Sequence, residues 1–153
     1  METSLQAIQS FNEKSNLGAY QLLAPIPKDF NGSIHNILGD ERDYELGETP
    51  DSYYCQQFNG IECITHLSIS TDNYTFFGTK VGDNVDPIKE IIQKEGYQLI
   101  SSDPTELEYT LNYITFSFKI NAEQKIVAMS VGIYNPNELQ RDAQNCLPLV
   151  SHL

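Results

Sequence analysis

Apolar residues recur along this chain at two spacings, one typical of helices and one of strands. Near the N-terminus they recur every three residues, which places Leu5, Ile8 and Phe11 on one face of a short helix. This helix is expected over about 4–14. The same helical spacing predicts a second helix over about 27–38.

A glycine-containing stretch raises the question of a phosphate-binding loop: GTKVGDNVDPIKEIIQKEGY. Such a loop needs Gly-Lys-Ser/Thr leading directly into a helix. Here Lys80 precedes the turn, and Asp86 would repel a phosphate. Asp86 as N-cap and Pro87 at the first helical position instead predict an ordinary helix, which ends at Gly96.

Alternation of apolar and polar residues predicts strands in both halves of the chain. The runs YYCQQF and IECITHLSIS flank Asn59-Gly60, a pair that favours a two-residue hairpin turn. Further strands are predicted over about 74–81, 109–120 and 125–134.

The order of these elements predicts an α+β fold, with an antiparallel sheet and helices packed on one of its faces. Two segments, 25–81 and 82–135, each read as a helix followed by a hairpin, and are predicted to be internal repeats that share one sheet. In this alignment Tyr54 corresponds to Tyr109. With the C-terminal tail 136–153, all 153 residues are expected to form a single compact domain.

Two runs carry a resemblance to a known family: GTKVGDNVDPIKEIIQKEGY and YITFSFKINAEQKIVAMSVGIY. They resemble the second unit of the tandem α+β repeats of beta-lactamase-inhibitor-protein-like proteins, which occur in small bacterial proteins. The resemblance covers 78–134, with a fainter one over 27–70. It implies a helical segment on an antiparallel sheet, whose other face and loops bind a partner protein. The shared motifs are structural, so no functional residue is carried over.

The chain is strongly acidic, with 21 Asp and Glu against 9 Lys and Arg and a net charge of -12. Such a field repels nucleic-acid phosphates and anionic membranes and attracts basic proteins. The N-terminal run lacks the basic and apolar regions of an export signal, and no segment approaches the roughly 18 apolar residues of a membrane span. We therefore expect a cytoplasmic protein, or an exported one if a signal peptide has been removed.

Histidines form no recognisable catalytic or metal-binding pattern. His35, His66 and His152 lie in none of the spacings typical of zinc sites, and no GxSxG motif is present. On a regular strand Cys63 and His66 would face opposite sides, whereas Cys55 could approach His66 across the hairpin. We expect a protein that is not an enzyme and that holds no cofactor or metal.

The three cysteines also bear on the compartment. An odd number, Cys55, Cys63 and Cys146, fits poorly with a disulfide scaffold. In the predicted hairpin register Cys55 faces Ile64 and Cys63 faces Gln56, so that the two sulfurs point to opposite sides of the sheet.

Acidic residues gather between the predicted second helix and first hairpin, and again in a shorter linker of the second half. Such segments are often merely solvated, but together with tyrosines they can also bind a basic protein. The predicted partner-binding residues are Asp40, Glu41, Asp43, Tyr44, Glu45, Glu48, Asp51, Tyr53, Tyr54, Asp103, Glu106 and Glu108.

These observations favour a module that neutralises a basic partner protein, such as an antitoxin-type immunity protein for a bacterial toxin. One alternative is an extracytoplasmic inhibitor-like or lipoprotein domain. Another is an acidic DNA mimic, which would carry its acids spaced along an extended face.

Overall fold

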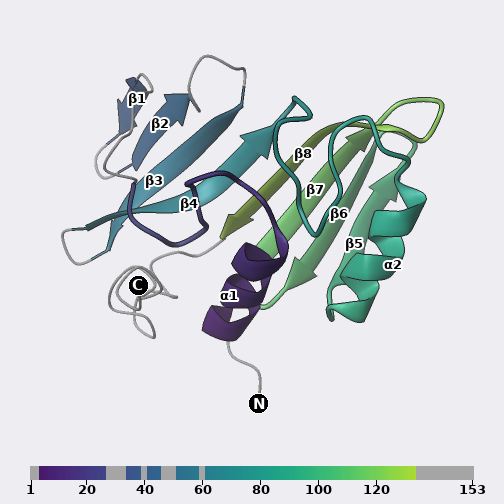
Figure 1. The fold of residues 1–153 in the computed structure, drawn as a ribbon, viewed down its shortest axis with the longest axis horizontal. Helices are drawn as coiled ribbons and strands as arrows, with labels where there is room; N and C mark the ends of the chain where they lie inside the picture. The colour runs from purple at the N-terminus through teal and green to yellow at the C-terminus, as the bar shows by residue number, and fades with distance from the viewer. Residues whose placement is uncertain (1–3, 27–33, 39–40, 46–50, 59–60, 134–153) are drawn as a thin grey trace.

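The computed structural model describes residues 4–26, 34–38, 41–45, 51–58 and 61–133 (Figure 1). In chain order its elements are α1 (Ser4–Lys14), β1 (Ile34–Leu38), β2 (Glu41–Glu45), β3 (Ser52–Phe58), β4 (Ile61–Ile69), α2 (Asp86–Lys94), β5 (Gln98–Asp103), β6 (Glu106–Leu111), β7 (Ile114–Ile120) and β8 (Ile126–Ile133).

The described strands form one antiparallel sheet in the order β1-β2-β3-β4-β8-β7-β6-β5. The first four strands follow one another as a meander, and so do the last four. The two meanders meet where β4 pairs with β8, in a register that runs from His66 opposite Gly132 to Ile69 opposite Met129. The predicted class, α+β with an antiparallel sheet, is confirmed.

The hydrophobic core lies against one face of this sheet and is centred on Phe116 of β7. Its ring is 5.4 Å from that of Phe11 in α1 and 4.9 Å from that of Tyr97, which follows α2. Ile88 and Ile92 of α2 are buried in the same core. Burial of such aromatic and branched side chains is the main stabilising contribution in a domain of this size.

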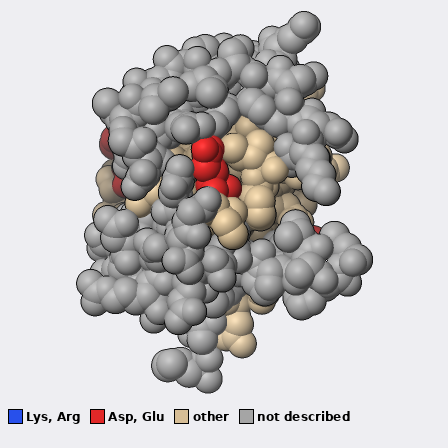
Figure 2. Space-filling model, turned by 90° about the vertical axis from the view of Figure 1, so that its left-hand side faces the viewer, with Lys and Arg blue, Asp and Glu red and all other residues tan. Residues whose placement is uncertain are grey.

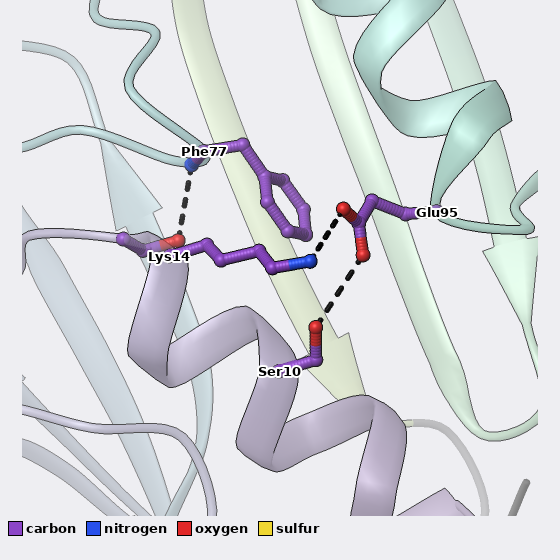
Figure 3. Close-up of polar contacts among 5 residues, drawn as sticks. Ser10, Lys14, Phe77 and Glu95 are labelled. Atoms are coloured by element: carbon purple, nitrogen blue, oxygen red, sulfur yellow. Dashed lines mark hydrogen bonds and ion pairs between the residues drawn. The ribbon is translucent and has the colours of Figure 1, made fainter.

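Polar contacts join the two helices on the core side (Figure 3). The ammonium of Lys14, at the end of α1, lies 2.7 Å from the carboxylate of Glu95, just after α2, and Ser10 Oγ donates to the same carboxylate. The backbone N–H of Phe77 donates to Ser15 Oγ at 3.1 Å. Figure 1 accordingly shows α1 and α2 on the same side of the sheet.

The predicted helix over 27–38 is wrong for its last five residues, because Ile34–Leu38 is strand β1. This strand pairs with β2, from Ile34 opposite Tyr44 to Leu38 opposite Glu41. Four apolar residues at helical spacing, Phe30, Ile34, Ile37 and Leu38, are a weak signal, and pairing with a neighbouring strand overrides it. Residues 27–33 lie outside the described part.

Two predicted strands are also corrected. Residues 74–81 form a tight turn instead of a strand: Phe76 and Thr79 exchange backbone hydrogen bonds of 2.8 and 2.9 Å around Phe77 and Gly78, which both have positive φ. The predicted strand over 109–120 is two strands, β6 and β7, separated by a turn at Asn112 with φ of 53°.

The other local predictions have mixed outcomes. The helix over 4–14 is confirmed as α1, and the strand over 125–134 as β8. Helix α2 ends before Gly96, as predicted, and Gly96 has a φ of 102°. Asp86, however, is the first helical residue and Val85 the N-cap, while Asn84 Oδ1 accepts the Asp86 N–H.

The predicted correspondence of Tyr54 with Tyr109 is wrong. Tyr54 lies in the third strand of the first meander, whereas Tyr109 lies in the second strand of its own meander. The tail, 136–153, lies outside the described residues.

Candidate functional site

The sheet face opposite the core carries a row of small polar residues where the two meanders meet. In the register, Ser68 of β4 pairs with Ser130 of β8, and Ser130 pairs with Ser117 of β7. All three are at least partly exposed, whereas their strand neighbours Leu67 and Val131 are buried. We call Ser68, Ser130 and Ser117 the serine row.

A shallow pocket of about 170 Å³ lies along the serine row. Its lining includes Ser70, Lys119 and Ala128 beside the three serines. Hydroxyls and one ammonium can donate hydrogen bonds to polar groups, and the hydroxyls can also accept them. The pocket is therefore suited to contact polar groups of a partner.

A second row, one step along the strands, combines an aromatic ring, an imidazole and a glycine. Tyr54 of β3 pairs with His66 of β4, which pairs with Gly132 of β8. The rings of Tyr54 and His66 are 6.0 Å apart in an edge-to-face arrangement. The absence of a side chain at Gly132 leaves the room that the His66 ring occupies.

Two predicted acidic residues lie on β6, beside the serine row. Glu108 pairs with Ser117 and is half-buried. Glu106 pairs with Lys119, and its carboxylate accepts a hydrogen bond of 2.8 Å from Ser117 Oγ. The carboxylates of β6 thus extend the polar surface from the serine row toward β5.

Asp103 organises the turn between β5 and β6. Its carboxylate accepts hydrogen bonds from the backbone N–H of Thr105 at 2.7 Å, from the Thr105 hydroxyl at 2.8 Å and from the N–H of Glu106 at 2.9 Å. These bonds, the Thr105 N–H foremost, lower the pKa of Asp103 below its ordinary value of 3.8. The residue remains exposed, so it can still contribute charge to a partner's surroundings.

Two predicted partner-binding residues are instead structural. Asp51 is buried, and its carboxylate accepts the backbone N–H groups of Ser70 at 2.7 Å and Thr71 at 3.1 Å, together with the Thr71 hydroxyl. Tyr53 is 2% exposed and packs in the core with its ring 5.0 Å from that of Tyr20. Their place in an acidic, tyrosine-containing run gave no sign of this burial.

Four other predicted residues of the first half lie in β2. Glu41, Asp43, Tyr44 and Glu45 belong to this strand instead of a loop. Asp43 is in register with Tyr54, and Glu45 with Ser52, which itself pairs with Ser68. Asp40 and Glu48 lie outside the described residues.

The acidic residues of the two halves do not form one patch. β2 and β6 are separated by β3, β4, β8 and β7 in the sheet, so that the serine row lies between them. In Figure 2, which faces the side of the molecule on which β1–β3 lie, a group of Asp or Glu atoms lies beside uncharged residues, and among the described residues no Lys or Arg is visible.

Sequence reasoning missed the serine row, although a signal for it exists. Each of its serines stands between two apolar residues in a predicted strand, in LSI, FSF and MSV. That context places the serine on the face opposite the core. What the sequence could not supply is the pairing of β4 with β8, which aligns the three.

The hairpin register around the cysteines is as predicted, with Cys55 opposite Ile64 and Cys63 opposite Gln56. A bulge between Tyr54 and Cys55 then shifts the register, so that His66 pairs with Tyr54. Cys63 and His66 consequently share a side of the sheet, and the expectation that they face opposite sides is wrong. Buried Cys55 is on the other side from His66.

Cysteine chemistry differs between the two residues. Cys55 is a buried cysteine, whereas Cys63 is disulfide-bonded. This bond runs against the expectation drawn from the odd number of cysteines.

Within the described ranges, no group of three or more His, Cys, Asp or Glu side chains is arranged to hold a metal ion. None of the described helices is long and apolar enough to cross a membrane.

Comparisons with protein-family models, with curated proteins and with solved structures found no match for this chain.

Proposed function

We propose that this chain is an acidic protein-binding module that neutralises a basic partner, as an antitoxin-type immunity protein neutralises a bacterial toxin. The observation that carries the proposal is the sheet face opposite the core. No helix of the described part covers this face, and acidic strands stand on both sides of its serine row. A basic protein could contact β2 and β6 together while its polar groups meet the serines between them.

Charge supports a basic partner. The net charge of -12 speeds the approach of a positively charged protein and discourages acidic ones. Tyr54 and His66 add a partly apolar contact of the kind that often anchors protein interfaces. The uncharged serine row argues against the DNA-mimic alternative, which requires acids spaced along the face.

The two four-stranded meanders also suit the proposed likeness to beta-lactamase-inhibitor-protein-like repeats. Each follows a helix, and they join through their last strands. We infer that they are repeats of one unit, with α1 and α2 as the corresponding helices. The sheet face opposite the core would then correspond to the one that those proteins present to a partner.

The test compares two variants of equal charge in binding a partner captured from the host's lysate. The first changes Glu41, Asp43, Glu45 and Glu108 to their amides. The second changes Glu13, Asp72, Glu90 and Glu123, which are exposed in helices and loops, in the same way. Both lose four negative charges, so that only the position of the charges differs.

We expect the wild type and the helix-and-loop variant to retain one basic protein in a salt-sensitive complex, and the strand variant to lose it. Equal binding by both variants would reject the sheet face as the site. A partner that is not basic, or whose activity is unchanged in the complex, would reject neutralisation.

One observation favours the extracytoplasmic alternative. Cys63 is disulfide-bonded, and disulfides persist mainly in oxidising compartments. Thiol titration of the denatured protein from its native host distinguishes the two locations. One free thiol per chain would support export, whereas three would support the cytoplasm.

A further inference from the structure

Strand β5, which stands at one end of the strand order, has an exposed edge. In the described part of the chain β5 is terminal in the strand order and pairs with β6 alone. All six of its residues are exposed. Backbone N–H and C=O groups of a strand alternate between its two sides, so that about half of those in β5 point away from β6.

This edge carries little of the protection usual for edge strands. Its sequence, QLISSD, contains neither Lys nor Pro, which commonly prevent a further strand from adding. Leu99 and Ile100 are 48% and 54% exposed. A register shift between Leu99 and Ser101 indicates a bulge, which limits regular pairing to a short segment. An edge of this kind suits one added strand better than an extended assembly.

The charges on and beside β5 indicate which kind of segment could pair with its exposed edge. The only charged residue of β5 is Asp103, and Glu106 and Glu108 lie on the adjacent strand. A second copy of the chain would bring another net charge of -12 to the same place. A basic extended segment would find complementary charge, backbone partners and two apolar side chains.

We propose that the edge of β5 binds an extended, basic segment of a partner protein as an additional strand. This inference rests on the proposed function, because it states how the basic partner is held. Backbone hydrogen bonds would supply affinity, and alternate basic and apolar side chains would supply selectivity.

The experiment uses the full chain and a pool of eight-residue peptides in which Lys alternates with Val, Ile or Thr. Amide hydrogen exchange and amide chemical shifts are measured by NMR. One control pool has Glu in place of Lys. Another has the Lys pool N-methylated at alternate residues, which removes hydrogen-bond donors along one edge and keeps the charge.

We expect the Lys pool to slow exchange in Gln98–Asp103, and the Glu pool to have no effect. The N-methylated pool should bind about tenfold more weakly, because two or more hydrogen bonds are lost. Ile100→Lys should abolish binding by adding a charge to the edge. Val127→Lys is its control, since Val127 is similarly exposed, at 44%, but lies on the internal strand β8.

The outcomes separate this inference from the proposed function. If the Lys pool binds in a salt-sensitive way but perturbs the serine row, the edge inference is overturned and an acidic binding face stands. If β5 becomes protected on concentration without peptide, a second copy is the occupant and the inference is likewise overturned. Absence of any effect on β5 rejects it too, and the lysate experiment then decides the proposed function independently.

Discussion

The imidazole ring of His66 lies over Gly132 on the neighbouring strand. A Cβ atom at Gly132 would stand 2.5 Å from His66 Nε2, well inside van der Waals contact. Both residues are in register at the junction of the two meanders, and the His66 ring also meets Tyr54 edge to face. The position of the ring therefore depends on the missing side chain opposite.

We expect Gly132→Ala to destabilise the protein by about 1 to 3 kcal/mol, the usual cost of overpacking. In a His66→Ala background the same substitution should cost nearly nothing, because all three of the closest atoms belong to His66. Urea unfolding of the four proteins of this double-mutant cycle measures the difference. Equal costs in both backgrounds would show that the backbone, not the ring, requires glycine.

We expect Asp51 to contribute to the stability of the fold and not to the binding of a partner. Asp51→Ala would leave the N–H groups of Ser70 and Thr71 without their acceptor, at a cost of about 2 to 3 kcal/mol. Asp72→Ala, an exposed acid in the same loop, is the matched control and should change stability by less than about 0.5 kcal/mol. Thermal or urea unfolding compares them, and similar values for both would contradict the assignment.

The ion pair between Lys14 and Glu95 should contribute little to global stability. The Lys14 side chain is 51% exposed and the Glu95 side chain 23%, so solvent screens their attraction. A double-mutant cycle with Lys14→Met and Glu95→Gln should give a coupling of about 0.2 to 1 kcal/mol, decreasing with added salt. A larger coupling that is insensitive to salt would indicate a buried pair instead.

The carboxyl group of Asp103 should titrate below its ordinary value. Since hydrogen bonds to the turn favour the charged form, the folded pKa is lower than the unfolded one. Its stabilising contribution is therefore present above about pH 3.8 and is lost as the pH falls through the lowered folded pKa. NMR titration should show the pKa of Asp103 moving up, toward 3.8, in Thr105→Ala, where one of its hydrogen bonds is lost. An unchanged pKa would mean that the backbone N–H groups alone set it.

Local patterns in the sequence were sufficient where neighbouring residues determine structure. The helix over 4–14 follows from its apolar spacing, and the β3–β4 hairpin from the turn preference of Asn59-Gly60. They failed at Ile34–Leu38, where pairing with β2 decides the conformation. They also failed at Asn112, a turn inside what reads as one continuous strand.

The candidate site could be predicted less well from the sequence, because its residues come together through the pairing of strands that are far apart in the chain. Asp51 reads as one more acid of an acidic run, and only the return of the chain at Ser70 and Thr71 shows its role. The serine row likewise requires β4 to lie beside β8. Glu106 and Glu108, by contrast, were predicted from local acidity alone; they lie beside the serine row, and their part in partner binding stays a prediction.

The junction of β4 with β8 has a kinetic consequence. Within each meander, successive strands pair with their neighbours in sequence, and such short loops close at little entropic cost. The β4–β8 junction joins Leu67 to Val131 and Ile69 to Met129, residues far apart in the chain. We expect the closing of that long loop to be the slowest topological event in assembling the sheet, because its entropic cost must be met before the pairing stabilises it. A newly made chain would therefore complete the polar face only after both of its halves had formed.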